Sequence, residues 1–197
     1  MLAAMPEYPA GRWTKVTPRA NSPLVDAEPI DICDDASLAT AIEIVSACDE
    51  IHELAVFRQA GPEDFPVDVR VVAGNIRSRN RIIVYVDVST SRESEELHAS
   101  VIRYVEAIVK AWDPDWLKAG TPEFNKQQPI KRVPGEVYVG WYTYISDRIP
   151  IDEDILDAGK VERIGCAGGQ YIMLDGTPTE PSLEQALLIR KALGYTE

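Results

Sequence analysis

An apolar stripe in the middle of the chain constrains the fold more than any other feature of the sequence. It consists of Leu97, Val101, Tyr104, Val105, Ile108 and Trp112. This spacing predicts an amphipathic helix, and the apolar face of such a helix has to be buried against another element. Thr90–Glu93 has the pattern of a capping box ahead of the stripe, and Asp113-Pro114 ends it. We therefore expect one long helix over this segment.

Segments with strand character lie on both sides of that helix. Val69–Ala73 and Arg81–Ser89 precede it, and the second of these alternates apolar residues on one face. Glu136–Ser146 follows and is rich in aromatic and β-branched residues, and Val161–Leu174 contains one or two further strands. Helices and strands do not alternate regularly. We therefore expect an α+β fold, in which an antiparallel or mixed sheet has helices packed mainly on one side.

Two further helices are predicted outside this central region. Apolar residues recur at helical spacing from Ser37 to Cys48, and Asp34 or Asp35 is available as the N-cap. The last helix opens with the capping-box pattern of Ser182–Gln185, and Gly194 is suited to its C-cap.

The length of 197 residues fits one compact domain. Residues 1–30 hold five prolines, so we expect an irregular N-terminal arm there and a single α+β domain over 31–197. No apolar run approaches the ~20 residues that span a bilayer, and the first residues lack the pattern of a secretory signal. The three cysteines fit neither a disulfide framework nor a zinc site. These features favour the cytoplasm.

Signatures of catalysis are weak throughout the chain. Gly165–Gln170 is rich in glycine but lacks the Gly-Lys-Ser/Thr ending of a P-loop, and no Gly-x-Ser-x-Gly motif occurs. The two histidines, His52 and His98, have no sequence neighbour that marks a nucleophile or a set of metal ligands. We therefore predict a protein that is not an enzyme and that has no catalytic, cofactor-binding or metal-binding residues.

One alternative uses the carboxylates in the second half of the chain. Asp152, Glu153 and Asp154, with Asp147 and Asp157 nearby, could supply oxygen ligands to a divalent cation. This segment does not match a calcium-binding loop, so a solvated acidic turn or helix start is the favoured interpretation. A carboxylate-based hydrolase that needs a divalent metal stays open as the alternative.

Acidic residues dominate the charge of the chain. Asp and Glu outnumber Lys and Arg by 32 to 20, which gives a net charge of −12. Nine acids and no Lys or Arg lie between Asp26 and Phe57. On a helix, Glu43, Glu50 and Glu53 would face solvent together, opposite the apolar positions. They are either an ordinary solvated face or a surface that speeds encounter with a basic partner.

Such a charge repels phosphate backbones and anionic lipids, so we expect no direct binding to nucleic acid or to a membrane. A basic protein is the partner that it attracts. The residues that charge alone nominates for partner binding are Glu43, Glu50, Glu53, Asp147, Asp152, Glu153, Asp154 and Asp157.

Three short motifs lie between about Val137 and Leu193. They are Gly140–Ser146, Gly168–Ile172 and Leu188–Leu193. In these motifs the chain resembles the immunity protein 52 family of bacterial polymorphic-toxin and type VI secretion systems. The motifs are short and not catalytic, and the first 60 residues contribute almost nothing to the likeness.

The resemblance implies a cytoplasmic α+β antitoxin. Such a protein binds a cognate toxin that carries a restriction-endonuclease-like domain, and so prevents it from cutting DNA. The resemblance supplies no toxin-contacting residues, so the nominated partner-binding residues depend on charge alone. A structural adaptor of a secretion system is the remaining alternative.

Overall fold

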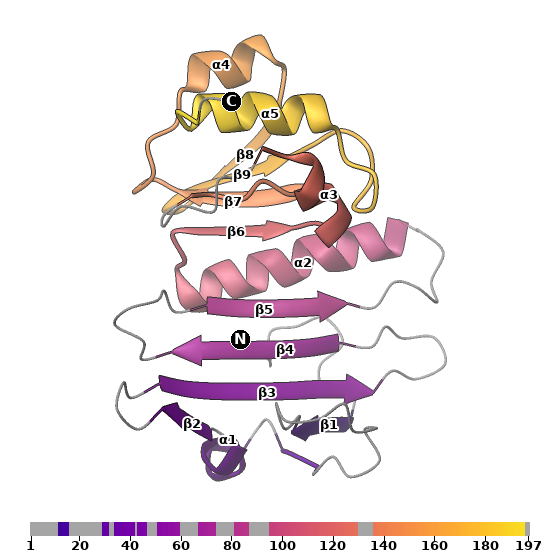
Figure 1. The fold of residues 1–197 in the computed structure, drawn as a ribbon, viewed down its shortest axis with the longest axis vertical. Coiled ribbons are helices and arrows are strands. Elements are labelled where there is room, and N and C mark those ends of the chain that lie inside the picture. Colours follow the sequence, from indigo (N-terminus) through magenta and orange to yellow (C-terminus); the bar gives the residue numbers. More distant parts are fainter. Residues whose placement is uncertain are drawn as a thin grey trace. The chain divides into compact units, whose positions relative to one another are not determined.

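The structure is a computed structural model that describes residues 12–15, 29–31, 34–41, 43–46, 51–59, 67–73, 81–86, 95–129 and 136–195. The chain divides into two compact units, residues 2–94 and residues 95–197 (Figure 1). Most of the expected N-terminal arm lies outside the described residues, and the division into residues 1–30 and 31–197 stays a prediction.

An antiparallel sheet forms the N-terminal unit. Its elements are β1 (Arg12–Lys15), α1 (Asp35–Ala41), β2 (Glu43–Ser46), β3 (Ile51–Gln59), β4 (Val67–Ala73) and β5 (Arg81–Val86). The order is β1-β3-β4-β5, and β2 also pairs with β3. The predicted strand at Val69–Ala73 is confirmed as part of β4, and the one at Arg81–Ser89 is confirmed up to Val86 as β5, while residues 87–89 lie outside the described residues. The register of these two strands pairs β-branched residues, which strands favour: Val69 with Val84, and Val71 with Ile82.

The helix predicted over Ser37–Cys48 is wrong beyond Ala41. Asp34 does cap α1, since its Oδ2 accepts a hydrogen bond of 2.9 Å from the Ser37 N–H. The chain then continues as β2, which pairs with β3 in antiparallel register. Ile44 and Val45 are β-branched, and such side chains lose rotamer freedom in a helix but fit a strand. Pairing with β3 therefore decides the structure of this segment.

In the C-terminal unit the structure describes four helices and a second antiparallel sheet, whose strand order is β6-β7-β9-β8. These elements are α2 (Glu95–Trp112), β6 (Trp116–Ala119), α3 (Pro122–Gln127), β7 (Tyr142–Ser146), α4 (Glu153–Ala158), β8 (Glu162–Cys166), β9 (Gly169–Met173) and α5 (Leu183–Ala192). The α+β class with an antiparallel sheet is thus confirmed.

Helix α2 (Glu95–Trp112) is the long helix that the apolar stripe predicts. Leu97, Val105 and Ile108 are buried, whereas Trp112 at the end of the stripe is 37% exposed. The helix stops at Asp113-Pro114 as expected, and Asp113 has a left-handed φ of 46°. The predicted cap at residues 90–93 lies outside the described residues.

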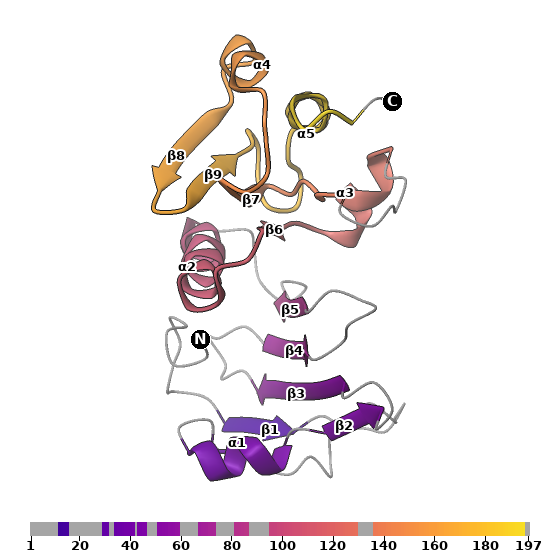
Figure 2. The same cartoon turned by 90° about the vertical axis from the view of Figure 1, so that its left-hand side faces the viewer.

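Helices cover both faces of the C-terminal sheet. Tyr142 lies on the face beside Glu106 of α2, and Arg163 on the opposite face forms ion pairs with α4. Figure 2 accordingly shows α2 on one side of the sheet and both α4 and α5 on the other. Every residue of β7 is buried as a result, so this strand lies at the centre of the unit.

The predicted strand over Glu136–Ser146 is wrong in its first half, because β7 begins only at Tyr142. A turn precedes it, in which the Thr143 hydroxyl accepts from the Gly140 N–H at 2.9 Å and donates to the Gly140 C=O at 3.1 Å. A Cβ on Gly140 would lie 2.1 Å from the Ala119 carbonyl oxygen, so only glycine lets these backbones approach.

The closing helix α5 follows its predicted signals. The Ser182 hydroxyl caps it by accepting from the Gln185 N–H at 3.3 Å. The Gln185 side chain, however, binds Asp175 instead of completing a capping box. Gly194, with a φ of 79°, forms a Schellman motif in which the Tyr195 N–H donates to the Arg190 C=O.

Candidate functional site

Five of the nominated carboxylates lie in one acidic segment, residues 147–157, and all five side chains are exposed. The segment runs from the end of β7 through α4. Leu156 holds α4 to the core with no exposed surface, and the Asp152 side chain caps the helix by accepting from the Ile155 N–H. A single buried anchor thus leaves Glu153, Asp154 and Asp157 facing solvent.

Arg163 of β8 partly neutralises this segment. Its guanidinium lies 3.8 Å from a Glu153 oxygen and forms a second ion pair with Asp157. Both acids are largely exposed, and exposed ion pairs contribute about 0–1 kcal/mol. No ion pair is found for Asp154 within the part of the chain that the structure describes. The segment therefore keeps an excess of negative charge.

The one base inside the segment, Arg148, is held by acids outside it. Its Nη1 lies 3.0 Å from Asp113 Oδ2, and its Nε lies 2.9 Å from Asp115 Oδ1. Hydrogen bonds to these carboxylates raise the pKa of Arg148, so the guanidinium stays charged and engaged. Asp147, in the turn after β7, donates its N–H to the Gly168 C=O at 3.0 Å and keeps its carboxylate exposed.

Glu43 and Glu53, two of the nominated partner-binding residues, lie on strands and not on a helix. Glu43 lies on β2 and Glu53 on β3, where they are direct partners in the antiparallel register. The prediction that they share one helical face is therefore wrong, although the strand pairing still places these two positions opposite each other. Glu50 lies outside the described residues.

The carboxylates of the acidic segment do not form a metal-binding group. Among the residues that the structure describes, no three His, Cys, Asp or Glu side chains gather closely enough to hold a metal ion. Asp152 is used as a helix cap, and Glu153 and Asp157 both turn to Arg163. The observed geometry thus gives no support to a carboxylate-metal centre in this segment.

An aromatic cluster with one thiol lies under α2. Tyr142 and Tyr171 stack with their ring centroids 5.4 Å apart, and Tyr144 packs against Tyr171 at 5.3 Å. Burial raises the pKa of Tyr171 to about 12 and also raises the pKa of Cys166. At neutral pH the phenol and the thiol are protonated. A reactive cysteine needs a lowered pKa, so the raised pKa of Cys166 argues against a reactive thiol. The packed rings assign the cluster to the core of the unit.

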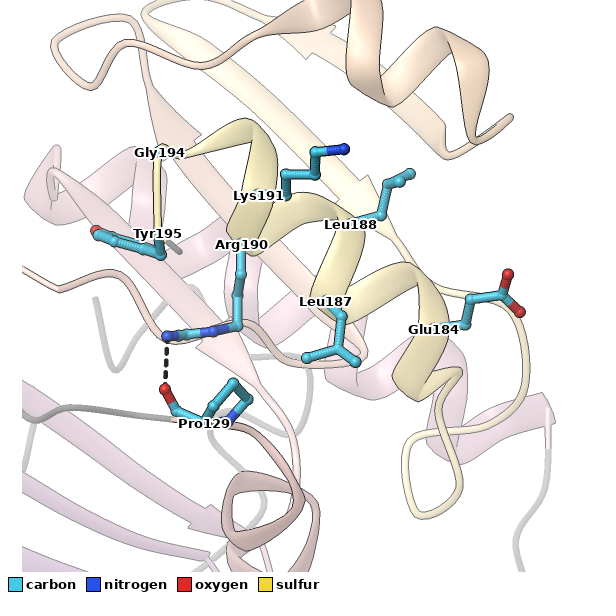
Figure 3. Close-up of a pocket in the computed structure, with 8 residues that line it drawn as sticks. All are labelled: Pro129, Glu184, Leu187, Leu188, Arg190, Lys191, Gly194 and Tyr195. Atoms are coloured by element: carbon cyan, nitrogen blue, oxygen red, sulfur yellow. Dashed lines mark hydrogen bonds between the residues drawn. The ribbon is translucent and has the colours of Figure 1, made fainter. Parts of the chain in front are cut away.

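A cavity of about 490 Å³ lies beside α5 (Figure 3). Its lining residues are Pro129, Glu184, Leu187, Leu188, Arg190, Lys191, Gly194 and Tyr195. Arg190 is 3% exposed and forms a buried ion pair of 2.7 Å with Glu136. Its Nη2 also donates to the Pro129 carbonyl at 3.0 Å, and its guanidinium lies 5.1 Å from the Tyr195 ring centroid.

Through these contacts Arg190 links α5 to segments about sixty residues earlier in the chain. The sequence predicts only a favourable charge at the end of a helix for this residue. No sequence signal could have revealed the pairing, since Glu136 belongs to an irregular segment. The charge of Arg190 is already balanced by Glu136, which assigns the residue a role in stability.

The chain matches no protein-family model, and comparisons with curated proteins and with solved structures also find no match. None of the described helices is long and apolar enough to cross a membrane.

Proposed function

We propose that the protein is a non-enzymatic immunity protein that binds and neutralises a nuclease-like bacterial toxin in the cytoplasm. The observation that carries the proposal is the acidic segment 147–157, with its five exposed carboxylates. A nuclease binds DNA through a basic surface that contacts phosphates. Carboxylates displayed on a folded protein are complementary to such a surface and can occupy it in place of DNA.

The resemblance to the immunity protein 52 family is the second support for the proposal. The motif residues lie on β7, β9 and α5, and Tyr144, Ile172 and Ile189 are at most 1% exposed. Buried residues of this kind specify a fold. They leave the exposed segments to determine which toxin is bound, in agreement with a binding surface that lies outside the motifs.

The proposal predicts how the complex forms. Exposed charges speed the encounter of oppositely charged proteins, and salt weakens this steering. Association with the protein encoded by the adjacent reading frame should therefore be fast at low ionic strength and slower as salt is added. Stopped-flow fluorescence at several salt concentrations measures this directly.

Asp154→Lys tests the acidic segment, because Asp154 is exposed and its replacement breaks no described ion pair. We expect association about tenfold slower for this variant, because it reverses a charge within the steering surface. Glu180→Lys is the matched control, since it makes the same charge change at an exposed position in the loop before α5. Equal rates for the two variants would remove the acidic segment from the interface, and a partner without nuclease activity would favour an adaptor.

A further inference from the structure

Strand β8 lies at one edge of the C-terminal sheet as far as the structure describes it. Among the described residues it pairs with β9 alone, and its register runs without a bulge from Glu162 to Cys166. In an antiparallel pair, every second residue directs its N–H and C=O away from the partner strand. Cys166 and Gly169 close a two-residue turn, so the outward residues of β8 are Arg163 and Gly165.

The second half of β8, from Ile164 to Cys166, has few of the features that usually keep an edge strand from pairing with another chain. Charged side chains and proline normally prevent an edge from pairing with another chain. In β8 the charges stand at the first two positions, and the Arg163 guanidinium is turned toward α4. Ile164 is 49% exposed, and a Cβ built on Gly165 would meet no described atom within 4 Å.

We infer that β8 is the docking strand of the proposed complex, and that an extended segment of the basic partner pairs with its free edge. This inference rests on the proposed function and names the part of the surface that the partner's backbone uses. The added strand would place an apolar side chain beside Ile164 and a basic side chain beside Glu162, because both residues lie on the same face of the sheet.

Charge complementarity selects a basic partner as the occupant. Arg163 links β8 to Glu153 and Asp157, so a strand added at this edge runs close to the acidic segment. A second copy of the chain could also pair there, with Ile164 beside Ile164. That arrangement would bring two acidic segments together on chains that each carry a charge of −12, and like charges oppose it.

Amide hydrogen exchange tests the inference on the full-length protein, free and bound to the protein encoded by the adjacent reading frame. The Arg163 and Gly165 amides should exchange quickly in the free protein and about tenfold or more slowly in the complex, because strand addition gives them hydrogen-bond acceptors. A complex that leaves both amides unchanged overturns the inference and leaves the proposed function standing. Failure to form any complex removes the proposed function, and this inference with it.

Two variants separate strand addition from simple attraction. Ile164→Lys removes the apolar contact and repels a basic strand, and Gly165→Pro removes an outward N–H; each should weaken binding about tenfold or more. Ile164→Val and Gln127→Lys are the controls, and both should bind as the wild type does. Circular dichroism checks that each variant is folded. Unchanged binding by folded Ile164→Lys and Gly165→Pro overturns the inference, as does a free protein of twice the monomer mass with protected β8 amides.

Discussion

Replacing Arg190 by methionine breaks the ion pair that links α5 to Glu136. The ion pair is 2.7 Å long, and the two side chains are only 4% and 2% exposed. Arg190→Met therefore removes this ion pair from a carboxylate whose side chain is only 2% exposed. Breaking a buried pair in this way costs about 3–5 kcal/mol, whereas replacing both partners with apolar residues is often close to neutral. The double variant Arg190→Met/Glu136→Leu should consequently recover most of the stability that the single variant loses.

Urea denaturation, followed by tryptophan fluorescence, measures both effects. Three of the four tryptophans belong to residues 95–197, and Trp141 among them is 3% exposed. With an m-value of about 2 kcal/mol per molar urea, a loss of about 4 kcal/mol lowers the midpoint by about 2 M. A single variant that loses less than about 1 kcal/mol, or a double variant no more stable than the single one, would refute the reasoning.

Three further changes test individual contacts. Gly140→Ala should destabilise the protein by about 1–3 kcal/mol in urea titrations, because its Cβ would collide with the Ala119 carbonyl; a neutral result would contradict the close approach. Ser182→Ala should lose about 1 kcal/mol through the missing helix cap, while Ser182→Asp should retain the cap. Burial lowers the pKa of Lys118 from 10.5 to about 8, so between these pH values the unfolded state binds more protons and stability rises with pH. Lys118→Met should flatten that rise between pH 8 and 10, and an unchanged slope would assign it to another group.

Local signals in the sequence predicted those elements whose boundaries are set locally. Helix α2 ends where Asp113-Pro114 stops it, and α5 begins and ends at its caps. Each of these signals acts within a few residues and needs no partner elsewhere in the chain. The class of the fold could therefore be predicted from the sequence.

Long-range pairing decided the elements that the sequence did not reveal. Glu43–Ser46 has apolar residues at positions that fit a helix, but hydrogen bonds with β3 make it a strand. Trp116–Ala119 is only four residues long and pairs with β7, about 25 residues later. A segment this short carries no periodicity of its own, so nothing local distinguishes it from a loop.

The candidate site divides in the same way. The exposure of Asp152, Glu153 and Asp154 agrees with the solvated helix start that the sequence favoured. The ion pairs of Arg163 and the open edge beside Ile164 depend on which strand lies next to which. Neither could be predicted without the sheet order.

Titration of DNA cleavage tests the central claim most directly. The protein encoded by the adjacent reading frame is incubated with plasmid DNA and increasing amounts of the present protein. Cleavage should stop at one equivalent, and Asp154→Lys should inhibit more slowly than Glu180→Lys at low salt. Cleavage that continues at a large molar excess of the wild-type protein would contradict the account.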